Sequence, residues 1–264
     1  MIQLQNENLG ILEQWKGDMT DSTCYSVMQG IGGSAWVENI ENPKGAVLVY
    51  GDFSFLLGEA VDNPEAELMD TLKKCGKTCS IFVPESKSWE HALEEKTTFI
   101  KGERYLLKEK TEPFDEELLK SYVARFPKGF EVKQIDANWY KKIVEDEWAK
   151  DLCCNFETVE KYEKYGLGFI AVKGDQIAAG ISSYASYDKG IEIEIDTREE
   201  FRRLGLATVL GATMILECME RGLYPHWDAA NMVSVRTAQR LGYEYNKPYV
   251  VYSNEPLKSL EYEE

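Results

Sequence analysis

Hydrophobic residues in the first half of the chain recur with two different spacings. Alternation with polar residues, or a short apolar run bounded by Gly or Pro, predicts a strand, and apolar residues three or four apart predict a helix. Strands are predicted in residues 45–60, where two strands join at Gly51-Asp52, in 77–85, and in 97–110, where two strands join at Gly102. Helices are predicted in 64–75 and 114–126. These elements predict an α/β domain of uncertain role over residues 1–127.

A Pro/Gly break at residues 127–129 separates this region from a more regular second half. The strands predicted there are 130–135, 168–172, 176–184, 191–195, 224–227 and 249–252. The predicted helices are 139–150, 158–164, 206–221 and 234–241. Strands that alternate with helices and hairpins indicate a mixed α/β sheet, so we expect a second domain over residues 128–264.

The composition narrows the class of protein. The chain has 264 residues, and its 44% hydrophobic content is enough to bury a substantial core. Its 46 acidic and 30 basic residues give a net charge of −16, which argues against a nucleic-acid-binding surface and favours a cationic partner such as an amine. The six cysteines have neither a disulfide-framework nor a zinc-site spacing, so we expect reduced thiols and no metal. The sequence has no leader pattern and no apolar run of about 18 residues, so a cytoplasmic location without membrane contact is expected.

Isoleucines and carboxylates alternate in the stretch GIEIEIDT: Ile191, Ile193 and Ile195 with Glu192, Glu194 and Asp196. Successive side chains of a strand point to opposite faces, so the isoleucines should share one face and the carboxylates the other. This pattern has two interpretations. One is a half-exposed strand with a polar outer face, and the other is a strand that lines a cleft and supplies a general base.

The stretch that follows has the spacing R-x-x-G-x-A at Arg202, Gly205 and Ala207, just before the helix predicted from residue 206. The first turn of a helix has unpaired N–H groups and the positive end of the helix dipole, which suit a phosphate. Gly205 and Ala207 lack the bulk that would keep a ligand from the backbone, and Arg198, Arg202 and Arg203 bring positive charge. Taken alone, the spacing also fits an ordinary turn with solvated arginines.

A second pattern, N-x-x-S-x-x-x-A-x-x-L-G-Y, follows about twenty residues later at Asn231, Ser234, Ala238 and Leu241–Tyr243. In order and spacing, the carboxylate strand, the R-x-x-G-x-A stretch, the long helix and this pattern resemble the GNAT superfamily of acyl-CoA-dependent N-acetyltransferases. The resemblance covers roughly residues 128–252 and implies a GNAT fold in the C-terminal half. The full chain also resembles bacterial two-part GNAT proteins, in which the smaller N-terminal half is a divergent or degenerate GNAT-like domain.

The resemblance implies a site for acetyl-CoA in which backbone N–H groups face the phosphates, so that Leu204 is tolerated where the family usually has a basic residue or glycine. The CoA-binding residues that it implies are Ile195, Thr197, Arg202, Arg203, Leu204, Gly205, Leu206, Ala207, Thr208, Asn231 and Ser234. Asn231 and Ser234 have a second interpretation as helix-capping residues. The implied substrate contacts are His226, Trp227 and Asp228, at the end of a strand where GNAT strands separate.

The resemblance also implies the catalytic groups. Glu192 and Glu194 lie on the strand that supplies a water-linked base in many GNAT enzymes, with Glu192 slightly preferred by its offset from Arg202. The tyrosine that many members use as general acid would fall at Ala238, which has no proton to donate. Tyr243 and Tyr245 are the nearest candidates in sequence for the acid, with Tyr243 named as the catalytic residue although its position is usually that of a core aromatic residue in the family. The assignment of the acid is left open.

The resulting hypothesis is an N-acetyltransferase that moves an acetyl group from acetyl-CoA to a primary amine of a small molecule by direct attack, without a covalent enzyme intermediate. The acidic residues near the cleft favour a cationic acceptor. The missing tyrosine keeps open an alternative, a non-catalytic acyl-CoA-binding or sensing module. Oligomerisation and the identity of the acceptor are left open.

Overall fold

The computed structural model describes residues 1–256, and the contacts within it divide the chain into two compact units. One unit consists of residues 1–104 and the chain from Pro248 onward, and the other of residues 105–247. The division therefore differs from the one expected near Lys128. The reason is that helix α4 (Glu116–Val123) packs on α7 (Leu206–Arg221) and buries Leu119 in the core of the second unit. Residues 257–264, the end of the expected second domain, lie outside the described part of the chain.

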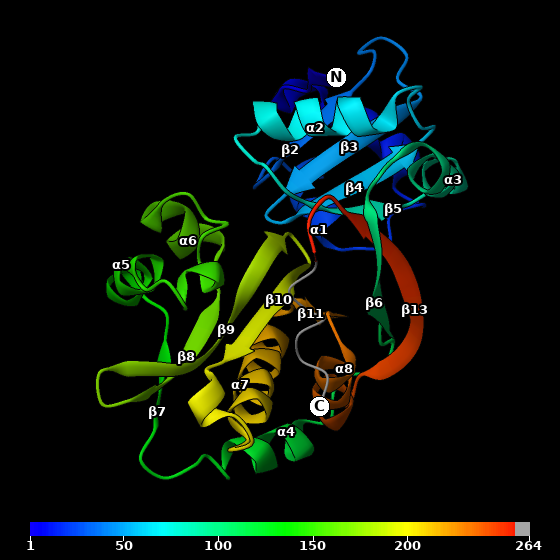
Figure 1. Ribbon diagram of the computed structural model, residues 1–264. Helices are drawn as coiled ribbons and strands as arrows, with labels where there is room; N and C mark the ends of the chain where they lie inside the picture. The colour runs from blue at the N-terminus through cyan, green and yellow to red at the C-terminus, as the bar shows by residue number, and fades with distance from the viewer. Residues whose placement is uncertain (257–264) are drawn as a thin grey trace. The chain divides into compact units, whose positions relative to one another are not determined.

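The first unit contains a mixed sheet with helices on it (Figure 1). Its strands are β1 (Ile2–Gln3), β2 (Ser34–Val37), β3 (Gly45–Tyr50), β4 (Phe53–Gly58) and β5 (Ile81–Pro84). The first four are antiparallel neighbours, and β5 runs parallel to β4. A parallel pair needs a crossover, which α2 (Pro64–Lys74) provides. The hairpin predicted at Gly51-Asp52 is confirmed, since Tyr50 pairs with Phe53.

The remaining helices of this unit pack on the sheet. Helix α3 (Lys87–Lys96) contacts α2 and β4, and its Trp89 is fully buried. A 3-10 helix, η1 (Asn6–Trp15), and α1 (Thr23–Met28) precede β2. Residues 97–110 contain a single strand, β6 (Ile100–Lys108), so the turn predicted at Gly102 was wrong. Gly102 is not among the glycines with positive φ, the conformation that a tight turn uses.

The second unit is built on a five-stranded sheet in the order β11-β10-β9-β8-β7. The strands are β7 (Glu131–Gln134), β8 (Gly168–Lys173), β9 (Gln176–Tyr187), β10 (Gly190–Thr197) and β11 (Tyr224–His226). They are antiparallel except for β10 and β11, which are joined through α7 and run parallel. Short strand β12 (Asp228–Ala229) pairs with β6, and helix α8 (Met232–Arg240) follows it. Strand β13 (Glu244–Ser253) leads back to the first unit, where its end pairs with β5.

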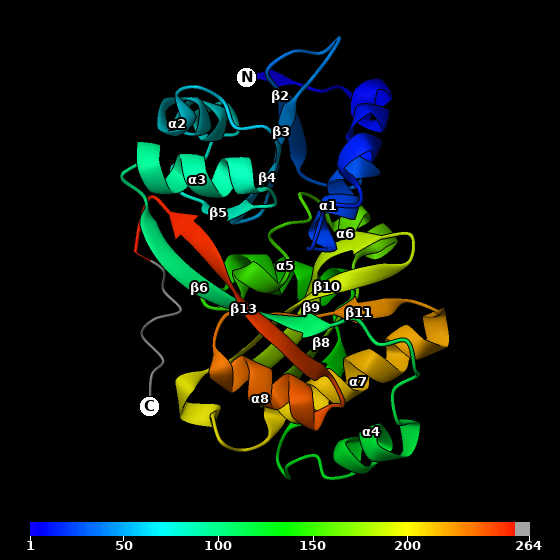
Figure 2. The ribbon, with the colours of Figure 1, turned by 90° about the vertical axis from the view of Figure 1, so that its right-hand side faces the viewer.

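Helices cover both faces of this sheet (Figures 1 and 2). On one face, α4 and α7 close a core that includes Leu206, Leu210 and Met214. On the other face lie α5 (Ala137–Glu145), the 3-10 helix η2 (Lys150–Leu152) and α6 (Val159–Tyr165), which form a second core. Within residues 1–256, no helix combines the length and the apolar composition that crossing a membrane requires.

Helix α5 is shorter than the predicted helix over 139–150. It ends at Glu145 because Asp146 is extended, with φ −85° and ψ 115°. The Asp146 carboxylate then accepts hydrogen bonds from the backbone N–H groups of Trp148 and Ala149, at 2.9 and 3.1 Å. A side chain that bonds nearby backbone in this way offers the chain an alternative to helix. The segment therefore turns toward η2.

Candidate functional site

Strands β10 and β11 run side by side and then part. Gly190, Ile191 and Glu192 pair with Tyr224, Pro225 and His226, and β11 ends there. Strand β10 continues to Thr197 with β9 as its partner on the other side. Among the described residues, the β11-facing edge of β10 beyond Glu192 is paired with no strand. Its N–H and C=O groups can therefore accept an extended ligand as an added strand.

The alternation predicted for β10 is confirmed. Ile191 and Ile193 are buried in the core against α7, and Ile195 packs on that core. The carboxylates point to the opposite face, where Glu194 is paired with Ser182, whose hydroxyl donates to the Leu152 carbonyl of η2. The pairing shifts by one residue between Glu192 and Ile193, and β9 carries the extra residue. The regular alternation of β10 survives this bulge.

The carboxylates of β10 become more exposed along the strand. Glu192 is buried, at 6% exposure, Glu194 is half-buried and Asp196 is exposed. Glu192 lies in the last residue pair before the two strands part, and its Oε1 accepts a hydrogen bond from the backbone N–H of Asp228 at 2.8 Å. The Glu192 carboxylate is thus fixed at the vertex between β10 and the chain that leaves β11.

The loop between β10 and α7 has an unusual backbone. Arg203 has φ 63°, the only positive φ of a non-glycine residue within residues 1–256, and Gly205 has φ 84°. Left-handed conformation at a non-glycine residue costs free energy and persists where the surrounding structure imposes it, often at ligand sites. The Arg202 Nε donates to the Thr197 carbonyl at 3.2 Å, which closes the loop on itself.

Helix α7 begins without a side-chain cap. Its N-cap is Gly205, which has no side chain to accept from the first turn, and a Cβ placed there would meet no atom within 4 Å. The backbone N–H groups of Leu206, Ala207 and Thr208 therefore lack the intrahelical partner that later residues have. Helices α1 and α2 also lack a side-chain cap, whereas side chains cap α3, α4, α5, α6 and α8.

The residues after β11 bond to one another. Asn231 is the N-cap of α8 and accepts from the Ser234 N–H at 3.0 Å. The Trp227 Nε1 donates to the Ser234 hydroxyl at 2.9 Å, and the Trp227 ring is buried against Tyr243. The structure thus places Asn231 in the capping role that the sequence offered as its second interpretation.

Tyr243 lies in the core. It is 4% exposed, and its ring packs edge-on against Phe114. Its hydroxyl donates to the Pro225 carbonyl at 2.6 Å, and burial raises the pKa of this hydroxyl well above its ordinary value. The geometry matches a packing role for Tyr243 and gives no support to the acid role. Ala238 is also fully buried.

His226 forms a pair that the sequence did not indicate. The Tyr187 hydroxyl and the His226 Nε2 are 2.8 Å apart, and the His226 ring lies against that of Tyr224, with centroids 4.6 Å apart. Burial lowers the pKa of His226 to about 4, so the imidazole is neutral at pH 7. Tyr187 is brought to His226 by the β9–β10 hairpin, since it pairs with Gly190, where a Cβ would come 2.9 Å from the tyrosine ring.

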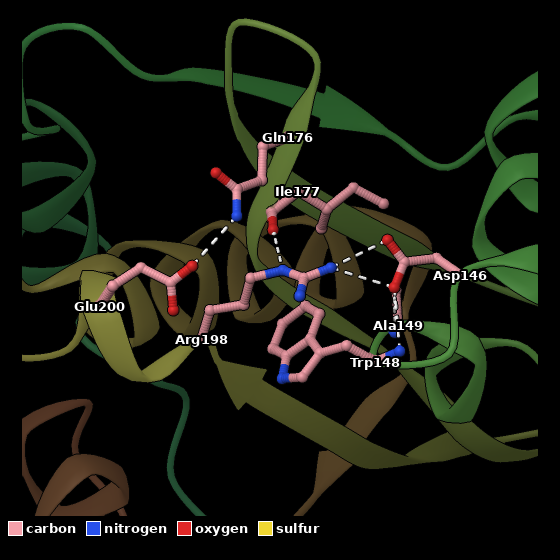
Figure 3. Close-up of polar contacts among 7 residues, drawn as sticks. All are labelled: Asp146, Trp148, Ala149, Gln176, Ile177, Arg198 and Glu200. Atoms are coloured by element: carbon pink, nitrogen blue, oxygen red, sulfur yellow. Dashed lines mark hydrogen bonds and ion pairs between the residues drawn. The ribbon is translucent and has the colours of Figure 1, made fainter.

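One arginine expected to add positive charge at the loop is neutralised. Arg198 forms an ion pair with Asp146, and its guanidinium lies over the Trp148 ring (Figure 3). The other two arginines of the loop are Arg202 and Arg203. Arg203 is exposed, as is Leu204 at 47%.

Comparison with known proteins identifies the family of this chain. The family model described as GNAT acetyltransferase matches residues 10–252, and the chain belongs to this family. A crystal structure of a GCN5-related N-acetyltransferase-like protein from Streptococcus suis 89/1591 is 38% identical and has a TM-score of 0.83, covering 93% of this chain and 98% of that one.

Two further relatives are more distant. The uncharacterized N-acetyltransferase YdfB of Bacillus subtilis (strain 168) is 28% identical over 137 residues, which are 48% of this chain and 49% of that protein. The chain thus matches about half the length of this curated relative. A tandem GNAT protein from the clavulanic acid biosynthesis pathway shares the fold, with a TM-score of 0.57 at 12% identity over 97% of this chain and 99% of that one.

Proposed function

We propose that this protein transfers an acetyl group from acetyl-CoA to a primary amine of a small molecule. The observation that carries the proposal is the position of buried Glu192 at the vertex where β10 and β11 part, on the strand that leads into the open first turn of α7. Membership of the GNAT acetyltransferase family supports the reaction class.

The residues present fit a CoA molecule. The uncapped first turn of α7 offers N–H groups at the positive end of a helix dipole, and Gly205 leaves open space beside them. Arg202 and Arg203 add positive charge for a diphosphate. The edge of β10 beyond Glu192, along which β11 no longer runs, offers backbone groups to the amides of the pantetheine arm. When bound, acetyl-CoA supplies the activated acyl group.

Glu192 is the better candidate for the general base of the two glutamates. Its carboxylate lies at the vertex and is oriented by the Asp228 N–H, whereas Glu194 lies two residues further along β10. The base must take a proton from the acceptor ammonium, directly or through a water molecule, so that the amine becomes a nucleophile. The net charge of −16 and the carboxylate face of β10 favour a cationic acceptor.

A second candidate function is a non-catalytic acyl-CoA-binding module. It is favoured by Ala238, which is fully buried where many family members have a tyrosine acid, and by the packing role of Tyr243. Both candidates require CoA binding, and only the first requires turnover.

The test is the release of free CoA thiol from acetyl-CoA with a panel of primary amines, together with the Kd of CoA. We expect Glu192→Gln to lower kcat by about 10²–10⁴-fold, since general-base catalysis contributes that much, with the Kd of CoA unchanged. The amide oxygen still accepts from the Asp228 N–H. The matched control is Glu194→Gln on the same strand, for which a smaller effect is expected. CoA binding without thiol release by any amine would favour the second candidate.

A further inference from the structure

Arg198 is the first residue after β10, and its side chain reaches three partners in two other segments (Figure 3). The Nε donates to the Ile177 carbonyl of β9 at 2.8 Å. One terminal nitrogen lies between both oxygens of Asp146, at 3.0 and 2.9 Å. The guanidinium carbon is 4.4 Å from the centre of the Trp148 ring. A guanidinium with this many fixed partners has little freedom to move.

Asp146 connects Arg198 to the segment between α5 and η2, which lies on the face of the sheet opposite α7. Its carboxylate also accepts from the Trp148 and Ala149 N–H groups, so it orients the turn between α5 and η2. That turn leads to Leu152, which contacts the carboxylate face of β9 and β10 through the Ser182 hydroxyl. The side chains of Arg198 and Asp146 are 21% and 32% exposed, so water screens their attraction less than it would at an open surface.

The backbone next to Arg198 forms the beginning of the loop that ends at Gly205. The Arg198 N–H donates to the Ala178 carbonyl at 2.9 Å, and the Arg198 carbonyl accepts from the Phe201 N–H at 2.9 Å. The Arg202 N–H donates to the Glu199 carbonyl at 3.2 Å, and the Gln176 side chain donates to Glu200 at 3.0 Å. The loop is therefore anchored where Arg198 leaves β10, and the left-handed residues follow within a few positions.

We propose that Arg198, through its ion pair with Asp146, is a positioning residue that holds the loop from Arg202 to Gly205 in the conformation that binds the diphosphate of acyl-CoA. The inference rests on the proposed function, because it takes CoA as the ligand. Arg198 does not contact the diphosphate in this proposal, because its guanidinium is paired with Asp146. It acts by holding the backbone at the start of the loop. Arg198 should therefore increase the affinity for a ligand that has the diphosphate and have no effect on the affinity for a ligand that lacks it.

The test compares two ligands in wild-type protein and in Arg198→Met, which keeps much of the side-chain length without the charge. The ligands are CoA, measured by Kd, and the diphosphate-free donor acetyl-pantetheine, measured by KM. We expect CoA to bind about tenfold more weakly to Arg198→Met, as the loss of a half-buried ion pair suggests. The KM of acetyl-pantetheine should not change. Asp146→Asn should weaken CoA binding in the same direction, and Arg198→Lys should restore part of the affinity.

The matched control is Arg221→Met. Arg221 forms an ion pair with Glu217 at 2.6 Å on the same helix, α7, at its end away from the loop. This variant should leave both ligands unaffected. Thermal unfolding of each variant separates a loss of affinity from a loss of fold, and Arg198→Lys and Asp146→Asn carry the test if Arg198→Met does not fold.

Two outcomes would overturn the inference. One is CoA binding by Arg198→Met or Asp146→Asn with wild-type affinity, which would leave the proposed function intact. The other is an equal loss for CoA and acetyl-pantetheine, which would assign Arg198 to general stability. Failure of the wild-type protein to bind CoA would instead overturn the proposed function and this inference together.

Discussion

Strands β10 and β11 separate in the second unit, and each leads to a helix. The two helices differ in how their N-termini are capped. Strand β10 leads through a left-handed loop to α7, whose N-cap Gly205 bonds nothing with a side chain. Strand β11 leads to α8, whose N-cap Asn231 accepts from the Ser234 N–H while the Ser234 hydroxyl accepts from Trp227. The N-terminal donors of the first helix have no side-chain cap, and the second helix satisfies part of its own donors with Asn231.

The R-x-x-G-x-A motif and the N-x-x-S motif belong to one family resemblance, but the two helix N-termini that they form differ in their hydrogen bonding. Both patterns point to a CoA site when they are seen as sequence. In the folded unit, residues after β11 are bonded within the protein: Trp227 to Ser234, Asp228 to Glu192 of β10, and Tyr243 to Pro225 of β11. In the proposed function, the side after β10 therefore binds the CoA phosphates, and the bonded residues after β11 support the site.

The largest effect is expected at the start of α7. Replacing Gly205 by valine should weaken CoA binding about 100-fold, because a β-branched residue disfavours a φ of 84° and its bulk obstructs the first-turn N–H groups. Isothermal titration with CoA measures the change.

The matched control for that variant is Gly222→Val at the other end of the same helix. Gly222 also has a positive φ, 68°, and a Cβ there also meets no atom within 4 Å. The two variants should lose similar stability, about 1–2 kcal/mol, since both force a left-handed residue. Equal CoA affinity of the two variants would contradict the assignment of the α7 N-terminus.

The second effect concerns His226 on the β11 side and depends on pH. The pKa of His226 is about 4 in the folded protein and near 6.5 when unfolded. Well above pH 6.5 neither the folded nor the unfolded state binds the proton on His226. As pH falls from 6.5 to 4, the unfolded chain binds it first, so the free energy of unfolding should fall by about 2 kcal/mol from this group.

Urea unfolding at several pH values measures this slope. His226→Gln should flatten it, because glutamine keeps a polar atom near Tyr187 and does not titrate there. The chain has one other histidine, His91, which is exposed on α3, so His91→Gln serves as the control and should keep the wild-type slope. If His226→Gln and His91→Gln both lose as much stability as the wild-type protein when the pH falls from 6.5 to 4, His226 does not act as a buried neutral group.

The smallest effect tests the α8 side of the comparison. Asn231→Ala removes a side-chain cap and should lower the free energy of unfolding by about 1 kcal/mol, the usual contribution of such a cap. The Kd of CoA should stay unchanged, because the Asn231 oxygen is bonded within the protein. If Asn231→Ala keeps the wild-type melting temperature but binds CoA much more weakly, Asn231 contacts the ligand and does not serve mainly as a helix cap.

Much of the second unit could be predicted because its signals are local. The isoleucine and carboxylate faces of β10 follow from the period of two, and the limits of α7 follow from Gly205 and Gly222 at its two ends. The ends of elements that depend on side-chain hydrogen bonds were harder to predict from the sequence. Helix α5 stops at Glu145 because the Asp146 carboxylate bonds the next N–H groups, and the helical pattern of the sequence continues past that point.

The family resemblance, the two faces of β10 and the loop that leads into α7 could all be predicted from the residue pattern. Each of these depends on residues that are close along the chain, where spacing and backbone conformation are enough. The folded structure was needed to show that Arg198 is held by Asp146, that Tyr187 contacts His226, and that Glu192 rather than Glu194 lies at the vertex. The two hydrogen-bonded pairs are separated by 52 and 39 residues along the chain. Contacts over such separations follow from the register of strands and the packing of helices, which no local pattern encodes.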